Sequence, residues 1–256
     1  MSTSEDKNLL RAANQFKTFV SDCGISDGAD FTIIEMGFGN GHFLKECELA
    51  GMETIGFEVR SDTYKKTKER YPDGNWHLYD GGKVPLEDEC CDYLVSFQVL
   101  EHVESIDKFL DESIRLLRPG GTMYHVFPNY RSFYEGHFNI LWLPFLTKST
   151  GRAYMKLIRK YSEYYETLKL VKPRTVRNAL DRHSDKLEII SLGKEEFFDK
   201  FNSVQIAKVR QKFLRNVLLW IDRRKYLKKF GLWFIVKCGM YYPLMIIAKK
   251  KVKGKE

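Results

Sequence analysis

The feature that most constrains the fold is an alternation of short apolar runs with helical patterns between residues 31 and 127. The apolar runs have the length of strands, and they lie at 31–36, 53–59, 75–79, 92–97 and 122–127. Helical patterns separate them at 40–50, 61–70 and 105–117, and two later runs at 186–192 and 242–250 also have strand character. Strands joined through helices pair in parallel by right-handed crossovers. The sequence therefore predicts an α/β fold, a Rossmann-like, doubly wound, mostly parallel seven-stranded sheet with helices on both faces.

The regular alternation ends after Pro128. Residues 129–146 are rich in aromatic side chains and resemble a loop, and helical stretches are predicted at 152–170, 174–182 and 195–230. An amphipathic helix is predicted at 8–22. No second domain separates cleanly, so we expect residues 1–256 to form a single domain with a helical insertion and a C-terminal elaboration.

The net charge of +8 is unevenly distributed. Residues 1–147 contain 14 Lys/Arg and 24 Asp/Glu, a net charge of −10, whereas residues 148–256 contain 28 and 10, a net charge of +18. We expect an acidic ligand-binding core at 1–147 and a basic elaboration at 148–256 on the side of the acceptor or partner. The asymmetry favours an anionic partner, which could be phosphate, nucleic acid or a lipid surface.

Composition also bears on localisation. The five cysteines are scattered without C-x-x-C spacing, and the first residues lack a basic segment followed by an apolar one. A cytoplasmic protein is expected. Residues 231–248 are apolar, but Lys237 and Pro243 interrupt them, which favours a helix followed by the last strand. Basic segments flank this stretch, so peripheral contact with an anionic membrane surface stays open.

Glycines gather directly after the first predicted strand, in "IIEMGFGNGHF" at 33–43. Gly37, Gly39 and Gly41 alternate, whereas the dinucleotide fingerprint G-x-G-x-x-G places its third glycine one residue later, so a nicotinamide cofactor is disfavoured. A turn without Cβ atoms allows a ligand to approach the backbone, and the helix that follows offers N–H groups to an anion.

Polar residues follow the other strands where a doubly wound sheet binds its ligands. Glu58 ends the second strand and can accept hydrogen bonds from ribose hydroxyls. Asp80 follows the third strand and can accept from an adenine amino group. Gln98 opens "QVLEH" after the fourth strand, and "FPNY" at 127–130 follows the fifth.

This ordered set resembles the class I S-adenosylmethionine-dependent methyltransferases. "EMGFGNG" resembles their first motif, E/D-x-G-x-G-x-G, with Glu35 at the acidic position, and Glu58 matches their ribose-binding acid. Asp80, Pro85 and Asp92 follow the spacing of a common family segment, and "RLLRPGG" resembles the turn before the fifth strand. The resemblance covers about 40% of the chain, roughly residues 30–130. It implies S-adenosylmethionine as cofactor, bound by Glu35, Gly37, Gly39, Gly41, Glu58, Asp80 and Gln98.

The acceptor half resembles a narrower group. "FPNYRSFYEGHFNILWLPFL" is similar to the segment after the fifth strand in methyltransferases of bacterial O-antigen and other surface polysaccharides. The resemblance implies O-methylation of a sugar hydroxyl on a surface glycan or its lipid-linked precursor. His137, beside Glu135, is the first candidate for the general base, and His102 is the second, with a structural role as its alternative. Tyr130 and Tyr134 could line an acceptor pocket or belong to the core, and His77 and His125 are expected to be packed side chains.

A further resemblance bears on metal binding. Glu101 and His102 resemble part of the E-x-x-E-H metal pattern of ubiquinone-pathway O-methyltransferases, but Gln98 replaces the first glutamate, so no metal is expected. The alternatives are an RNA methyltransferase, a small-molecule or quinone-type O-methyltransferase and a non-catalytic cofactor-binding scaffold.

Overall fold

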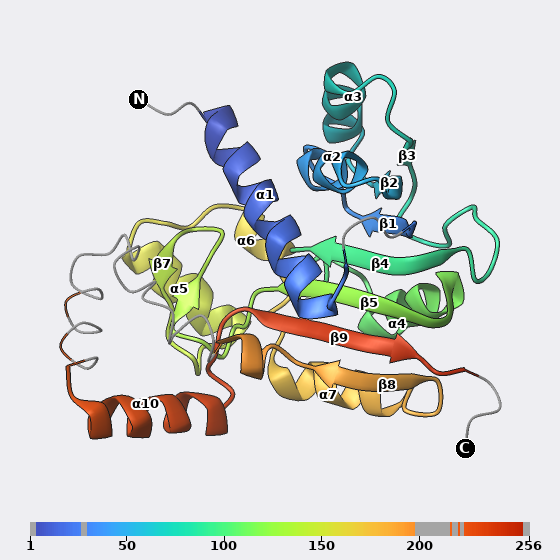
Figure 1. Cartoon of the computed structure of the whole chain (residues 1–256). Helices are drawn as coiled ribbons and strands as arrows, with labels where there is room; N and C mark the ends of the chain where they lie inside the picture. Colours follow the sequence, from blue (N-terminus) through green and yellow to red (C-terminus); the bar gives the residue numbers. More distant parts are fainter. Residues whose placement is uncertain (1–3, 27–29, 198–215, 217–219, 221–222, 253–256) are drawn as a thin grey trace. The chain divides into compact units, whose positions relative to one another are not determined.

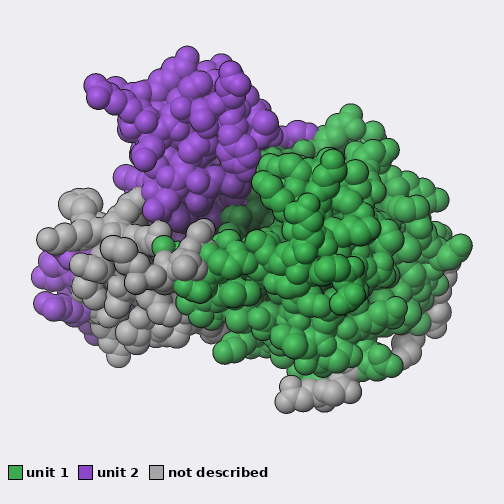
Figure 2. All heavy atoms as spheres, turned by 90° about the horizontal axis from the view of Figure 1, so that it is seen from above, with its two compact units in different colours: residues 1–126, 178–190, 246–256 green, residues 127–177, 191–245 purple. Residues whose placement is uncertain are grey.

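The computed structural model describes residues 4–26, 30–197, 216, 220 and 223–252. The chain divides into two compact units (Figure 2). Unit 1 comprises residues 1–126, 178–190 and 246–256, and unit 2 comprises residues 127–177 and 191–245. This division does not follow the change of net charge at residue 147, because two segments of the basic half belong to unit 1.

A seven-stranded sheet has the order β3-β2-β1-β4-β5-β9-β8 (Figure 1). The four pairings among its first five strands are all parallel. The strands are β1 (Thr32–Met36), β2 (Glu53–Glu58), β3 (Trp76–Leu78), β4 (Cys91–Phe97), β5 (Leu117–Phe127), β8 (Leu187–Ser191) and β9 (Leu244–Lys250). The accompanying helices are α1 (Ser4–Cys23), α2 (His42–Leu49), α3 (Ser61–Arg70) and α4 (Ile106–Leu116). The predicted α/β fold class and its strand assignments are confirmed.

The two faces of the sheet are covered by different helices, as neighbouring residues of β5 show. Tyr124 faces Phe19 of α1, with ring centroids 5.3 Å apart. His125 points to the opposite face, where its ring lies 5.1 Å from that of Phe109 in α4 and its Nδ1 is 2.9 Å from Ser96 Oγ. Burial lowers the pKa of His125 to about 3, so the imidazole is a neutral core group, as predicted.

The start of β5 differs from the prediction. "RPGG" was expected to form a turn between helix and strand, but α4 ends at Leu116 and β5 begins at the next residue. The irregularity is absorbed inside the strand, where the register with β4 shifts between Cys91 and Tyr93 and Gly120 has φ +84°. A local bulge therefore replaces the expected turn.

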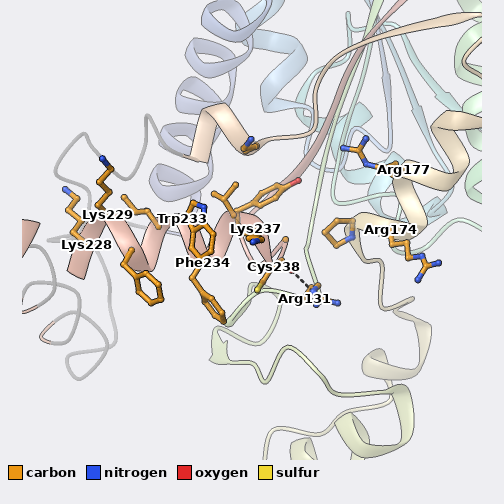
Figure 3. Close-up of a pocket in the computed structure, with 16 residues that line it drawn as sticks. Arg131, Arg174, Arg177, Lys228, Lys229, Trp233, Phe234, Lys237 and Cys238 are labelled. Atoms are coloured by element: carbon orange, nitrogen blue, oxygen red, sulfur yellow. Dashed lines mark hydrogen bonds between the residues drawn. The ribbon is translucent and has the colours of Figure 1, made fainter. Parts of the chain in front are cut away.

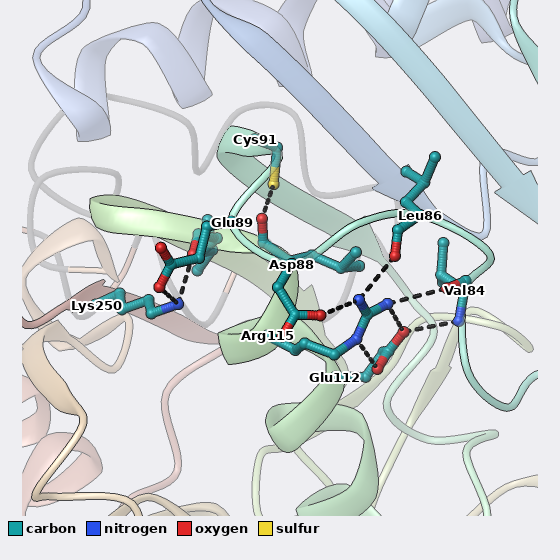
Figure 4. A network of polar contacts seen from close by, with 10 residues as sticks. Val84, Leu86, Asp88, Glu89, Cys91, Glu112, Arg115 and Lys250 are labelled. Atoms are coloured by element: carbon teal, nitrogen blue, oxygen red, sulfur yellow. Dashed lines mark hydrogen bonds and ion pairs between the residues drawn. The ribbon is translucent and has the colours of Figure 1, made fainter.

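A polar network ties the segment before β4 to α4 (Figure 4). The guanidinium of Arg115 donates to the carbonyl oxygens of Leu86 and Val84, at 2.8 and 2.9 Å, and to the carboxylates of Asp88 and Glu112. Those two acids raise the pKa of Arg115, chiefly because its guanidinium donates hydrogen bonds to Glu112. The segment after Asp80 is thus fixed by one partly buried cation whose donors are satisfied.

Unit 2 is built around an aromatic core. The core consists of Tyr130, Ile140, Trp142, Met155, Tyr165 and Leu168. Its elements are the two-stranded sheet β6 (Tyr134–Glu135) with β7 (Ile140–Leu141), and the helices α5 (Lys148–Leu157), α6 (Tyr164–Thr167) and α10 (Lys225–Lys237). Helix α7 (Pro173–Asp181) crosses from unit 2 into unit 1. The loop-like prediction for 129–146 holds except for the short β6–β7 pair.

One helix prediction needs correction. The stretch predicted at 152–170 is two helices, and the first begins earlier because Thr147 and Thr150 form a reciprocal capping box. Arg159, with φ +54°, lies between them. Most of the helix predicted at 195–230 lies outside the described residues.

The apolar stretch at 231–248 forms the end of α10 and then β9, as predicted. Among the described residues, no helix has the length and apolar character needed to cross a membrane.

Candidate active site

The glycine turn lies where the strand order reverses. β1 pairs with β2 on one side and with β4 on the other, so the segments after β1 and β4 meet at the topological switch point. The backbone N–H groups of Gly37 and Phe38 donate to the carbonyl oxygen of Phe57 at 2.7 and 3.2 Å. Thr67 Oγ1 of α3 donates to the carbonyl oxygen of Gly39 at 2.8 Å. The turn is therefore held on both sides.

The three glycines have different roles, although all three have positive φ. A Cβ on Gly37 would lie 2.5 Å from Val99 Cγ2, and one on Gly41 would lie 2.7 Å from Thr67 Cγ2. A Cβ on Gly39, with φ +56°, would meet nothing within 4 Å. Gly37 and Gly41 are required by packing of the protein itself. Gly39 alone has open space beside it, and this is where a ligand can approach the backbone.

Glu58 joins the end of β2 to the glycine turn. Its Oε2 accepts from the N–H of Gly39 at 3.1 Å, and its Oε1 accepts from the N–H groups of Val59 and Arg60 at 2.9 and 3.0 Å. Its side chain is buried, 6% exposed. A carboxylate offers about four acceptor positions, so Oε2 retains capacity for a ribose hydroxyl while it holds the turn.

Glu35 is the second carboxylate beneath the turn, 2% exposed. Its Oε2 has no hydrogen-bond partner among the described residues. Burial, and secondarily the charge of Glu58, raises the pKa of Glu35 well above its ordinary value of 4.5. A buried acceptor without a donor is costly unless a ligand supplies one, so the position fits a bound ammonium or water.

The remaining residues of the predicted set lie at the same strand ends in unit 1. Asp80 is exposed, and its Oδ1 accepts from the N–H of Gly82 at 2.8 Å. Gln98 has φ +60°, and its Oε1 accepts from Arg11 at 2.8 Å. His102 is exposed, and its N–H donates to the carbonyl oxygen of Val99 at 2.8 Å. Their roles toward a ligand stay predictions.

His137 belongs to unit 2, where it forms a pair with Glu135. Its Nδ1 lies 2.8 Å from Glu135 Oε1, and the two side chains are 10% and 1% exposed. The carboxylate also accepts from Tyr130 Oη at 3.2 Å and from the N–H of Phe138 at 2.7 Å. Such a carboxylate places the proton on Nδ1, which makes Nε2 the basic atom of the ring. The arrangement suits an oriented general base.

Sequence reasoning missed several contributors. Tyr130, left open between pocket and core, is a core residue that also orients Glu135. Val99 is the side chain that makes glycine necessary at position 37. Asp92, known only by its spacing, accepts from the N–H of Thr32 at 2.9 Å and so aligns β4 with β1. Among these contacts, the sequence pointed only to the one around Glu135, because Glu135 lies two residues before His137.

Comparison with known proteins agrees with this geometry. The profile of the family described as "Methyltransferase domain" matches residues 34–125. A probable S-adenosylmethionine-dependent methyltransferase of Mycolicibacterium smegmatis is 31% identical over 121 residues, 47% of each chain. A ubiquinone biosynthesis O-methyltransferase of Mesorhizobium japonicum is 28% identical over 97 residues, 36% of this chain and 39% of that one. The matches thus span less than half the length of these relatives.

The fold has a counterpart among solved structures. An S-adenosylmethionine-dependent methyltransferase from Mesorhizobium loti superposes with a TM-score of 0.55 at 14% identity, covering 97% of this chain and 99% of that chain. This likeness supports the fold.

The matched profile identifies a methyltransferase domain at residues 34–125, and the fold and the glycine turn agree with the class I S-adenosylmethionine-dependent type that the sequence resembles. The cofactor is S-adenosylmethionine, which supplies an electrophilic methyl group on a sulfonium. The residues present fit it, since the open face of Gly39, the acceptor capacity of Glu58 and the unsatisfied Glu35 Oε2 lie at adjoining strand ends.

Proposed function

We propose that this protein transfers the methyl group to a hydroxyl of a sugar, on a surface glycan or its lipid-linked precursor. The observation that carries the proposal is the Glu135–His137 pair at 2.8 Å, in the "YEGH" segment after β5. An acceptor with a pKa far above neutral needs a base to remove its proton. A neutral amine acceptor already presents a lone pair to the methyl group, so it would not need a base to remove a proton first.

S-adenosylmethionine, when bound, would supply the methyl group to the acceptor oxygen, and the hydroxyl proton would pass to Nε2 of His137. Glu135 holds the imidazole in the required tautomer and stabilises the imidazolium that forms. In this proposal Glu35 and Glu58 bind the cofactor, and His102 lies beside the cofactor without acting as the base.

The relative from ubiquinone biosynthesis favours a second candidate, a small-molecule or quinone-type O-methyltransferase. An RNA methyltransferase is a third, since basic surfaces bind phosphate backbones. Mass spectrometry of glycans from cells with and without the protein, together with methyl transfer to isolated glycan, RNA and quinol precursors, would separate these candidates. A methyl group that appears on RNA or on the quinol but not on the glycan would refute the sugar assignment.

The base is tested by His137→Ala, for which we expect turnover to fall by about 10²–10⁴-fold with cofactor affinity retained. Glu135→Gln should lower turnover and shift its pH dependence, because Gln does not stabilise the imidazolium. His102→Ala should instead affect cofactor binding or stability.

His183→Ala is the matched control for these variants. His183 is another buried histidine paired with a carboxylate, with Nε2 3.1 Å from Asp111 Oδ1 and Nδ1 2.8 Å from the carbonyl oxygen of Ala179. Loss of activity in His102→Ala with normal cofactor binding, and near-normal turnover in His137→Ala, would reverse the assignment. Near-full activity in both variants would mean that no base is used.

A further inference from the structure

Unit 2 contains a cavity of about 1600 Å³ that the catalytic assignment does not use (Figure 3). It lies between α10, the start of α7 and neighbouring loops of the same unit. Basic side chains from several segments line it, among them Arg131, Arg174, Arg177, Lys194, Lys229 and Lys237. The described residues that line it include no aspartate or glutamate.

Four of these basic groups have no ion-pair partner within the described part of the chain. Arg174, Arg177, Lys229 and Lys237 form no ion pair there with a carboxylate within 4.0 Å. The Nε of Arg131 donates to the carbonyl oxygen of Cys238 at 2.6 Å, which fixes its guanidinium at the end of α10. Like charges gathered without counter-charges repel one another and attract an anion.

The carboxylates of Glu195 and Glu196, which follow Lys194, act on Tyr241 of the lining but do not line the cavity themselves. Glu195 and Glu196 accept from Ser191 Oγ, at 3.2 and 2.7 Å. Arg174 and Arg177 both belong to α7 and both line the cavity, where their side chains extend in different directions (Figure 3). A guanidinium group matches the geometry of a phosphate, so each of the two can bind one.

The other wall of the cavity is apolar. Phe230, Trp233 and Phe234 of α10 line it and are 61%, 50% and 44% exposed. Their rings pack together, with centroids 5.8 Å apart for Phe230 and Trp233 and 6.5 Å for Phe230 and Phe234. Lys237 Nζ lies 4.6 Å from the Trp233 ring. Large exposed aromatics beside lysines are typical of surfaces that contact lipid.

We propose that this cavity binds a phosphorylated lipid. The phosphate is held by arginines that line the cavity, Arg131, Arg174 or Arg177, and the hydrocarbon chain lies along Phe230, Trp233 and Phe234. The cavity exceeds the roughly 300–1,000 Å³ of typical small-molecule pockets, as an acyl or isoprenoid chain requires. A membrane phospholipid and a lipid-linked glycan both have this chemistry, and the site does not depend on which hydroxyl the enzyme methylates.

The test is calorimetric titration of the full chain with dihexanoyl phosphatidic acid below its micelle concentration. Inorganic phosphate and dihexanoyl phosphatidylcholine serve as the phosphate-only and zwitterionic comparisons. We expect phosphatidic acid to bind, and Arg174→Gln/Arg177→Gln to weaken it by roughly tenfold or more, as for lost charge-assisted hydrogen bonds. Trp233→Ser should weaken phosphatidic acid without changing the response to phosphate.

Lys156→Gln/Lys160→Gln is the matched control, because it removes the same charge from exposed positions of unit 2 outside the cavity. Titration with S-adenosylmethionine verifies that each variant is folded and separates this test from that of the methyl transfer. An equal loss in the control pair would show general electrostatic attraction and overturn the proposal. Two other results would also overturn the proposal. One is inorganic phosphate that binds as tightly as phosphatidic acid, and the other is a protein that binds phosphatidic acid only when the lipid is in vesicles.

An RNA oligonucleotide that displaces phosphatidic acid and loses affinity in Arg174→Gln/Arg177→Gln would also overturn the proposal, in favour of a nucleic-acid site.

Discussion

Alanine substitutions in the glycine turn should separate the packing role of Gly37 from the ligand-facing role of Gly39. Both residues have positive φ, +79° and +56°, which costs an alanine about 1–2 kcal/mol. At Gly37 the new Cβ would also lie 2.5 Å from Val99 Cγ2, and overpacking of this kind costs typically about 1–3 kcal/mol. We therefore expect Gly37→Ala to lower the free energy of unfolding by roughly 2–5 kcal/mol and Gly39→Ala by roughly 1–2 kcal/mol.

Gly51→Ala is the matched control. Gly51 has φ +87°, nothing lies within 4 Å of its Cβ position, and it follows α2 at the end opposite the turn. Its destabilisation should equal that of Gly39→Ala, because both variants incur the backbone cost alone. Only Gly39→Ala should also weaken S-adenosylmethionine, by roughly tenfold or more, which corresponds to about 1.4 kcal/mol.

Urea unfolding gives the stabilities and calorimetry gives the cofactor affinities. Wild-type affinity in Gly39→Ala would show that the cofactor does not lie against this backbone, and the placement would be wrong. A Gly37→Ala variant as stable as Gly51→Ala would show that Val99 moves aside at no cost, and the packing argument would fail.

Two further predictions concern the carboxylates beneath the turn. Glu58→Ala should weaken S-adenosylmethionine by about 1.5–3 kcal/mol, the contribution of a hydrogen bond to a charged group, and calorimetry showing unchanged affinity would contradict this. The folded-state pKa of Glu35 is raised, so the stability it contributes is present below its ordinary value of 4.5 and is lost as pH rises through the folded-state pKa. Glu35→Gln should therefore raise the urea midpoint of the cofactor-free protein at neutral pH, and this gain in stability should vanish below the ordinary pKa of the carboxyl group. The same variant should bind the cofactor more weakly. A gain in stability that does not change with pH would rule out ionisation of Glu35 as its cause.

The alternation of apolar runs and helical patterns determined the α/β class, because burial on both faces of a parallel sheet requires continuous apolar strands. The strands at 31–36, 53–59 and 92–97 were placed to within one residue, and the spacing of Glu35, the glycines and Glu58 indicated the cofactor. These features are local, so the sequence contains them directly.

Features that depend on contacts between distant residues could not be obtained in this way. The difference between Gly37 and Gly39 is set by Val99, some sixty residues along the chain, and three glycines of one pattern look alike until the β4 segment lies beside the turn. The strand that includes "RPGG" was missed because its bulge is stabilised by pairing with β4.

The sequence by itself determined which cofactor the motifs of this chain indicate. It also showed that His137, the candidate base, has a glutamate two residues before it. Only the tertiary structure decided that Glu135 is buried and bonded to His137, that Tyr130 belongs to the core, and that arginines of α7 and aromatics of α10 line one cavity. The physical reason is that the environment of a charged or aromatic side chain depends on residues remote in sequence, which come together only when the chain is packed.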